Sequence, residues 1–198
     1  MRGASLTVVL GIALVASAAV AADEARPDSA KGKPALVVMD VQNAYLPYMD
    51  EADTEGALRM INATIGLFRE RGLPVIRVYH TDSERGPAPD TEPFQFPDSV
   101  VVLDGDPMVV KSRPSAFNGT ELERILREQS VDTVFLSGLS AVGCVLATYF
   151  EGDGLGFRVF MVRGGLISHK ATLTDAVEEM TGAVGYGAIE YMLEGATR

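Results

Sequence analysis

Apolar and polar residues alternate along this chain in a way that predicts strands and helices in turn. Continuous apolar runs, which are typical of buried strands in a parallel sheet, lie at 35–39, 73–79, 107–110, 133–136 and 157–162. Apolar residues at helical spacing lie between them, over 51–71, 118–126, 143–151 and 171–181. A last short strand is expected at 188–192. We therefore predict an α/β fold of three layers, α/β/α, with a mostly parallel, six-stranded Rossmann-like sheet and helices on both faces.

The N-terminal 22 residues have the pattern of a bacterial-type secretory signal peptide. One basic residue, Arg2, precedes an apolar stretch that ends in small residues at 19–21. An uncleaved membrane anchor is the alternative interpretation, although the apolar run is short for a span. A polar leader follows over 23–33, which we expect to be mobile, and the folded domain is expected over 34–198. We thus expect an exported protein, periplasmic or secreted, with no stable membrane span after cleavage.

Composition argues against nucleic acid as a partner and contains a single cysteine. The chain has 198 residues, 47% of them hydrophobic, and a formal net charge of −10. This balance suits one globular domain, and without a basic patch nucleic acid is not an expected partner. Cys144 is the single cysteine. A lone cysteine in an exported protein is a buried inert residue, an intermolecular link or a functional thiol.

Three chemically distinctive residues follow predicted strands. Asp40 ends the first strand, Lys111 ends the third, and Cys144 comes after the fourth, at the start of a helix. Each alone could be structural, but the carboxyl ends of parallel strands meet at one edge of a sheet, so we expect them to converge. The helix N-terminus and Lys111 would lower the pKa of the thiol, and Asp40 would accept its proton. With N–H groups of the turn at 139–144 as an oxyanion hole, this set suits attack on an amide carbonyl of a small-molecule substrate.

Other residues near the same edge are candidates for substrate contact. His80 ends the second strand, and it either touches substrate or simply ends the strand. Gln42 and Tyr45 line the pocket or hold the loop after the first strand. Arg113 could bind a substrate carboxylate, or it could be an exposed side chain without that role.

A long polar loop at about 81–99 separates the second and third strands. Loops of this length in compact domains are often lids or binding loops. It contains Phe94 and Phe96, which could cover a substrate in this subunit or in a neighbouring one.

The candidate residues lie in three segments that, in order and separation, resemble a known family. The segments are 36–42 (LVVMDVQ), 111–122 (KSRPSAFNGTEL) and 137–145 (SGLSAVGCV). Together they resemble the isochorismatase-like cysteine hydrolase superfamily, which includes nicotinamidases and N-carbamoyl amidases, over about residues 34–192. The resemblance implies a catalytic triad of Asp40, Lys111 and Cys144. It also implies a cis peptide at Leu139–Ser140, with the N–H groups of Ser140 and Cys144 as oxyanion donors.

The chain also departs from some members of that superfamily. Nicotinamidases carry a metal site with an Asp-x-His pair after the second strand and a further histidine. Here His80 and His169 are the only histidines, so such a site cannot be assembled, and we predict no metal and no cofactor. Members that cleave isochorismate commonly lack the cysteine, so Cys144 favours the amide-cleaving branch. Members often form homo-oligomers, and the resemblance leaves a homo-oligomer open for this chain.

These observations predict an exported, metal-independent cysteine hydrolase that cleaves the C–N bond of a small amide through a thioester on Cys144. Two alternatives remain at this point. One is an isochorismatase-type vinyl-ether hydrolase in which Asp40 protonates the substrate and the cysteine is incidental. The other is a non-catalytic binding or redox protein on the same fold.

Overall fold

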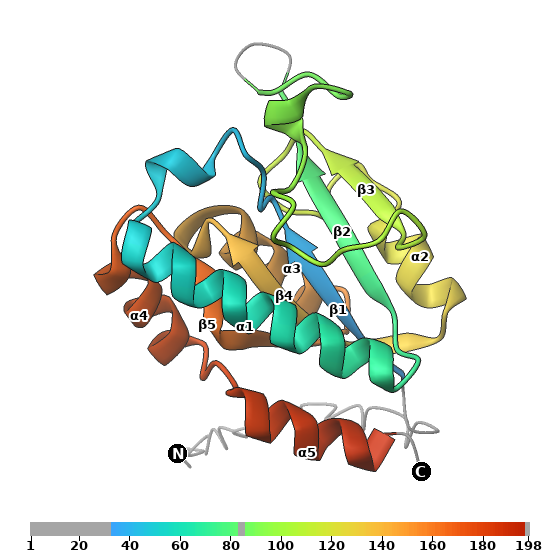
Figure 1. Cartoon of the computed structure of the whole chain (residues 1–198). Helices are drawn as coiled ribbons and strands as arrows, with labels where there is room; N and C mark the ends of the chain where they lie inside the picture. The colour runs from blue at the N-terminus through green and yellow to red at the C-terminus, as the bar shows by residue number, and fades with distance from the viewer. Residues whose placement is uncertain (1–32, 83–85, 197–198) are drawn as a thin grey trace, which may run out of the picture. The chain divides into compact units, whose positions relative to one another are not determined.

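A parallel sheet of five strands forms the centre of the domain (Figure 1). The computed structural model describes residues 33–82 and 86–196; the predicted signal peptide, and the predicted leader apart from Lys33, lie outside these residues. The strands lie side by side in the order β3-β2-β1-β4-β5. Their bounds are β1 Lys33–Met39, β2 Val75–His80, β3 Met108–Lys111, β4 Val131–Leu139 and β5 Arg158–Ile167.

Helices cover both faces of the sheet, which confirms the predicted three-layer α/β/α fold. Their bounds are α1 Glu51–Glu70, α2 Leu122–Glu128, α3 Leu146–Gly154, α4 Ala171–Met180 and α5 Tyr186–Ala196. One apolar cluster joins α1 and α5 to one face, and a second joins α2, α3 and α4 to the other. Three short helical turns complete the order: η1 Leu46–Tyr48, η2 Glu92–Phe94 and η3 Ala141–Val145, which is kinked at Gly143. None of the described helices has the length and hydrophobicity that a membrane crossing needs.

The sheet has five strands rather than the predicted six, because residues 188–192 belong to α5. Ile189 and Leu193 are four positions apart and both buried, whereas Glu190 and Tyr191 between them are exposed. This is the period of a helix packed on one side. A five-residue apolar run does not distinguish the two structures, and the prediction of a strand here is wrong.

The loop between β2 and β3 contributes to the core through its aromatic residues. Phe94 and Phe96 are buried, and their rings stack on Tyr79 at centroid distances of 4.9 and 4.5 Å. The burial of large aromatic rings fastens this part of the loop to the sheet. The prediction that these two rings cover a substrate is therefore wrong.

The carboxyl ends of the two central strands approach each other unusually closely. Met39 of β1 pairs with Gly138 of β4, and Gly138 has φ +113°. A Cβ atom at position 138 would lie 2.1 Å from the carbonyl oxygen of Met39. Only glycine combines that backbone conformation with that distance. The next residue of β1 is Asp40, so this contact lies directly beside the candidate site.

Candidate active site

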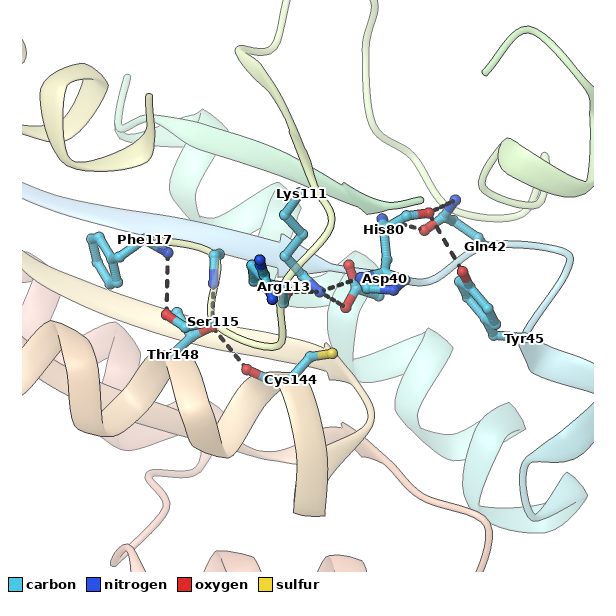
Figure 2. A network of polar contacts seen from close by, with 11 residues as sticks. Asp40, Gln42, Tyr45, His80, Lys111, Arg113, Ser115, Phe117, Cys144 and Thr148 are labelled. Atoms are coloured by element: carbon cyan, nitrogen blue, oxygen red, sulfur yellow. Dashed lines mark hydrogen bonds and ion pairs between the residues drawn. The ribbon is translucent and has the colours of Figure 1, made fainter. Parts of the chain in front are cut away.

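The structure brings Asp40, Lys111 and Cys144 together at the carboxyl edge of the sheet (Figure 2). The Lys111 Nζ atom lies 2.8 Å from Asp40 Oδ2. A carboxylate oxygen of Asp40, a ring nitrogen of His80 and Cys144 Sγ all lie within 4.8 Å of one another. The residues come from four strand ends that parallel topology places along one edge. Residues distant in the sequence thus form one compact polar cluster.

The Lys111 ammonium is fully buried and held by three contacts. Nζ lies 2.8 Å from Asp40 Oδ2, 2.9 Å from His80 Nδ1 and 3.2 Å from the carbonyl oxygen of Arg113. An ammonium group has three protons, so each contact can receive one. Lys111 is therefore fixed in one orientation, with its charge directed at Asp40.

Asp40 is a buried carboxylate with acceptor capacity to spare. Its backbone adopts the left-handed region, at φ 56°, which is uncommon outside glycine and is frequent at functional sites. Burial raises its pKa to about 6, although Lys111 acts in the opposite direction. Oδ2 lies 2.8 Å from Lys111 Nζ, and the carboxylate also interacts with the side chain of Cys144. At neutral pH Asp40 is mostly ionised and can accept a proton from a neighbour.

Cys144 lies in η3, immediately before α3, as the predicted strand–turn–helix pattern requires. The thiol is largely buried, and burial together with the Asp40 carboxylate raises its pKa to about 11. The expectation of a lowered thiol pKa is therefore wrong, because burial and Asp40 outweigh Lys111. The thiol is neutral and stands beside a carboxylate that can take its proton.

A cis peptide bond and two backbone hydrogen bonds shape the turn before Cys144. The Leu139–Ser140 peptide bond is cis. The carbonyl oxygen of Ser140 accepts hydrogen bonds from Gly143 N at 2.9 Å and Val145 N at 3.3 Å, which closes the turn. Leu139 and Ser140 line the same pocket as Cys144. That the N–H groups of Ser140 and Cys144 bind an oxyanion stays a prediction.

Thr148 ties the cysteine turn to the segment that follows Lys111. Its hydroxyl donates to the carbonyl oxygen of Cys144 at 2.8 Å and accepts from Ala116 N at 2.9 Å (Figure 2). Thr148 is fully buried one helical turn after Cys144. Thr148 lies four positions after Cys144, a spacing at which a threonine hydroxyl can reach the main chain of the earlier residue in a helix. Sequence analysis did not use this spacing.

A pocket of about 260 Å³ opens onto the cluster. Its lining residues are Asp40, Tyr45, Tyr48, Met49, His80, Leu139, Ser140 and Cys144. The Tyr45 hydroxyl reaches toward the carbonyl oxygen of His80 at 3.5 Å, and burial with nearby Asp40 and Asp82 raises the pKa of Tyr45 to about 12. Sequence analysis did not predict Tyr48 and Met49 as pocket residues. Their position just after Tyr45, in the same short turn, could have indicated this.

Two of the predicted contact residues do not line this pocket. Gln42 is buried, and its amide is engaged by the main chain: Nε2 donates to His80 O at 3.1 Å and Phe94 O at 2.9 Å, and Oε1 accepts from His80 N at 2.7 Å. Gln42 therefore holds the end of β2 rather than a ligand. Arg113 is exposed, and its carbonyl oxygen contacts Lys111.

One group of potential metal ligands occurs in the described part of the chain, formed by Asp40, His80 and Cys144. Carboxylate, imidazole and thiolate are ligand types that zinc accepts. The Lys111 ammonium, however, lies within 2.9 Å of both Asp40 and His80, so its positive charge stands between two of the three groups. This arrangement opposes a cation, and the expected absence of a metal stays a prediction.

Comparison with known proteins identifies the family. The Isochorismatase domain model matches residues 34–185. The uncharacterized isochorismatase family protein YrdC of Bacillus subtilis is 31% identical over 133 residues, covering 66% of this chain and 71% of that protein. N-carbamoylsarcosine amidase of Arthrobacter sp. is 38% identical over 69 residues, which cover 35% of this chain and 26% of that enzyme.

A solved structure extends the likeness beyond short segments. N-carbamoylsarcosine amidase from Thermoplasma acidophilum aligns with a TM-score of 0.67 and 27% identity, covering 77% of this chain and 95% of that one. The relatives of this chain include amidases, and the match to the family model spans most of the chain. The protein therefore belongs to the isochorismatase family and is a hydrolase.

Proposed function

We propose that the protein hydrolyses the C–N bond of a small amide through a thioester on Cys144. One observation carries this proposal: a carboxylate oxygen of Asp40 and Cys144 Sγ lie within 4.8 Å of each other, and both residues line the same pocket. A neutral thiol needs a base when it attacks, and a carboxylate with free acceptor capacity can serve as one. The amidase relatives support the same bond type.

The first half of the reaction forms the thioester. Cys144 Sγ attacks the amide carbonyl carbon, and the thiol proton passes to the Asp40 carboxylate. The negative charge that develops on the carbonyl oxygen is received by the N–H groups of Ser140 and Cys144. Asp40 then gives its proton to the amide nitrogen, the C–N bond breaks, and the amine leaves.

The second half releases the acid. Water attacks the thioester carbon, Asp40 accepts a proton from that water, and the C–S bond breaks. The proton returns from Asp40 to Cys144 Sγ, which restores the thiol. Lys111 stays charged throughout and favours the ionised form of Asp40, to which it lies 2.8 Å away.

The test is the Cys144→Ala variant of the mature protein, assayed for ammonia release from a panel of small primary amides. We expect turnover to fall by at least about 10³-fold, because the covalent step is lost. Quenched wild-type enzyme should carry an acyl mass on the peptide that contains Cys144, and the variant should not. Thermal unfolding of both proteins controls for folding. If Cys144→Ala retains turnover, the reaction does not proceed through a thioester on Cys144.

A vinyl-ether hydrolase is the second candidate, since Asp40 with a pKa of about 6 can also donate a proton near neutral pH. In that reaction Asp40 protonates the substrate and Cys144 is not needed. Activity on isochorismate that is lost in Asp40→Asn and kept in Cys144→Ala would select it.

Two further proposals concern the whole protein. We propose that it is exported, periplasmic or secreted, because residues 1–22 have the pattern of a signal peptide. N-terminal sequencing of protein recovered from the periplasm or medium tests this. We also propose a homo-oligomer, because members of the superfamily that the sequence resembles often form one. Light scattering of the purified protein is the test.

A further inference from the structure

The contact between Lys111 and His80 determines which form of the imidazole is present. Lys111 Nζ lies 2.9 Å from His80 Nδ1 (Figure 2). An ammonium group can only donate, so Nδ1 must accept. An imidazole that accepts at Nδ1 is neutral and carries its proton on Nε2. Lys111 therefore fixes the tautomer of His80 as Nε2–H.

That Nε2–H group is a donor without a protein acceptor. His80 lines the pocket, and among residues 33–82 and 86–196 its Nε2 makes no hydrogen bond. Gln42 holds the His80 main chain from both sides, through His80 N at 2.7 Å and His80 O at 3.1 Å. With its ring tied to Lys111 and its main chain tied to Gln42, His80 presents one donor in a fixed place.

The remaining pocket lining carries no spare positive charge in the described part of the chain. Lys111 and Asp40 neutralise each other across 2.8 Å, and Tyr45, Tyr48, Met49, Leu139 and Ser140 are uncharged. A substrate carboxylate placed here would lose its hydration without gaining a cationic partner, which is costly.

We propose that His80, held by Lys111 as the Nε2–H tautomer, makes the pocket specific for small, uncharged amides that carry a second carbonyl or ether oxygen. That oxygen accepts the hydrogen bond from His80 Nε2, while the scissile amide lies at Cys144. The inference rests on the proposed amide hydrolysis and deepens it by naming the substrate class.

A series of three primary amides tests the substrate class by a common readout, ammonia release. Methyl succinamate is uncharged and has a second carbonyl; succinamate replaces the ester by a carboxylate; hexanamide is uncharged and lacks the acceptor. We expect kcat/KM for methyl succinamate to exceed that for each of the other two by at least about 10-fold, which is typical of a buried hydrogen bond or an unpaired buried charge. A preference for succinamate, or equal use of hexanamide, would overturn this inference and leave amide hydrolysis standing. No release from any of the three would contradict both proposals.

Two His80 variants separate the roles of the two ring nitrogens. In His80→Asn the amide oxygen can replace Nδ1 as the acceptor for Lys111, but the pocket donor is lost. In His80→Gln the amide nitrogen can replace the Nε2 donor, but the acceptor for Lys111 is lost. We expect Asn to abolish the preference for methyl succinamate over hexanamide, mainly through KM. We expect Gln to keep that preference with a lower kcat for both amides. Thermal unfolding controls for folding, and a preference that survives in His80→Asn would refute the assigned donor.

Discussion

Two buried carboxylates in this domain, Asp40 and Glu178, have the same charge and nearly the same burial but different surroundings. Their exposed fractions are 2% and 6%, and burial raises the pKa of both. Glu178 lies on α4, on the side of the sheet that α4 shares with α2 and α3, whereas Asp40 follows β1 at the carboxyl edge.

The two carboxylates differ in how their oxygens are used. Glu178 Oε1 accepts a 2.6 Å hydrogen bond from Gly164 N, and Oε2 lies 3.6 Å from Arg163. These contacts connect α4 to β5, so Glu178 contributes to stability. Asp40 instead faces Lys111 Nζ, 2.8 Å away, and the Cys144 thiol, which is the group that it would deprotonate. The same functional group is structural where its lone pairs are engaged and reactive where they are left for a substrate or a thiol.

The largest effect should come from Asp40→Asn. An asparagine amide cannot accept the Cys144 proton, so we expect kcat for amide hydrolysis to fall by about 10²–10⁴-fold, the usual range for loss of a general base. The measurement is steady-state kinetics with the best amide found in the series above. Glu178→Gln is the matched control and should keep kcat, because its contacts lie away from the pocket. Equal losses of kcat in both variants would show that the two carboxylates do not differ in function.

Lys111→Met should reveal the cost of burying Asp40 through the pH dependence of stability. Because the pKa of Asp40 is about 6 in the folded protein and 3.8 ordinarily, its contribution to stability already falls as pH rises through that interval. Without Lys111 its pKa rises further. We expect the variant to lose about 3–5 kcal/mol of unfolding free energy at pH 8, and less at pH 5, where the carboxyl is protonated. Urea unfolding from pH 5 to 8 measures this, and a deficit that is constant over the range would count against the coupling.

Glu178→Gln should show the smallest of the three effects, and in stability alone. The substitution removes the charge that pairs with Arg163 and weakens the bond from Gly164 N, so we expect a loss of about 1–2 kcal/mol. Glu179→Gln, at an exposed neighbouring position, should change stability by less than about 0.5 kcal/mol. Unfolding in urea compares the pair. If the two variants are equally stable, Glu178 does not join α4 to β5 in the way its contacts indicate.

The fold was largely predictable because buried parallel strands leave a strong local signal. Runs of apolar residues located all five strands, and helical spacing located α1 and α4 to within a few residues. The prediction of a sixth strand was wrong because a five-residue apolar run fits a strand and a helix equally well. Only packing against α1 and β1 decides in favour of the helix α5. Order along the chain also placed Asp40, Lys111 and Cys144 at one edge, since parallel topology determines which strand ends meet.

The properties of the site were less predictable because they depend on contacts between distant segments. The direction of the Cys144 pKa follows from its burial and from Asp40, which is more than a hundred positions away. Gln42 looked like a pocket residue, yet its amide is matched to main-chain atoms of His80 and Phe94. The partner of a polar side chain is a tertiary property, and the sequence supplies only the candidate.

The glycine at the close approach of β1 and β4 has a consequence for how this family can diversify. Gly138 lets the main chains of the two strands meet directly before Asp40 and the cysteine turn, so the separation of base and nucleophile is set by backbone atoms. The side chains that shape the opening, among them Tyr45, Tyr48 and Met49, come from a different segment, around η1. Substrate preference can therefore diverge by substitution around η1 while the reacting groups keep their spacing.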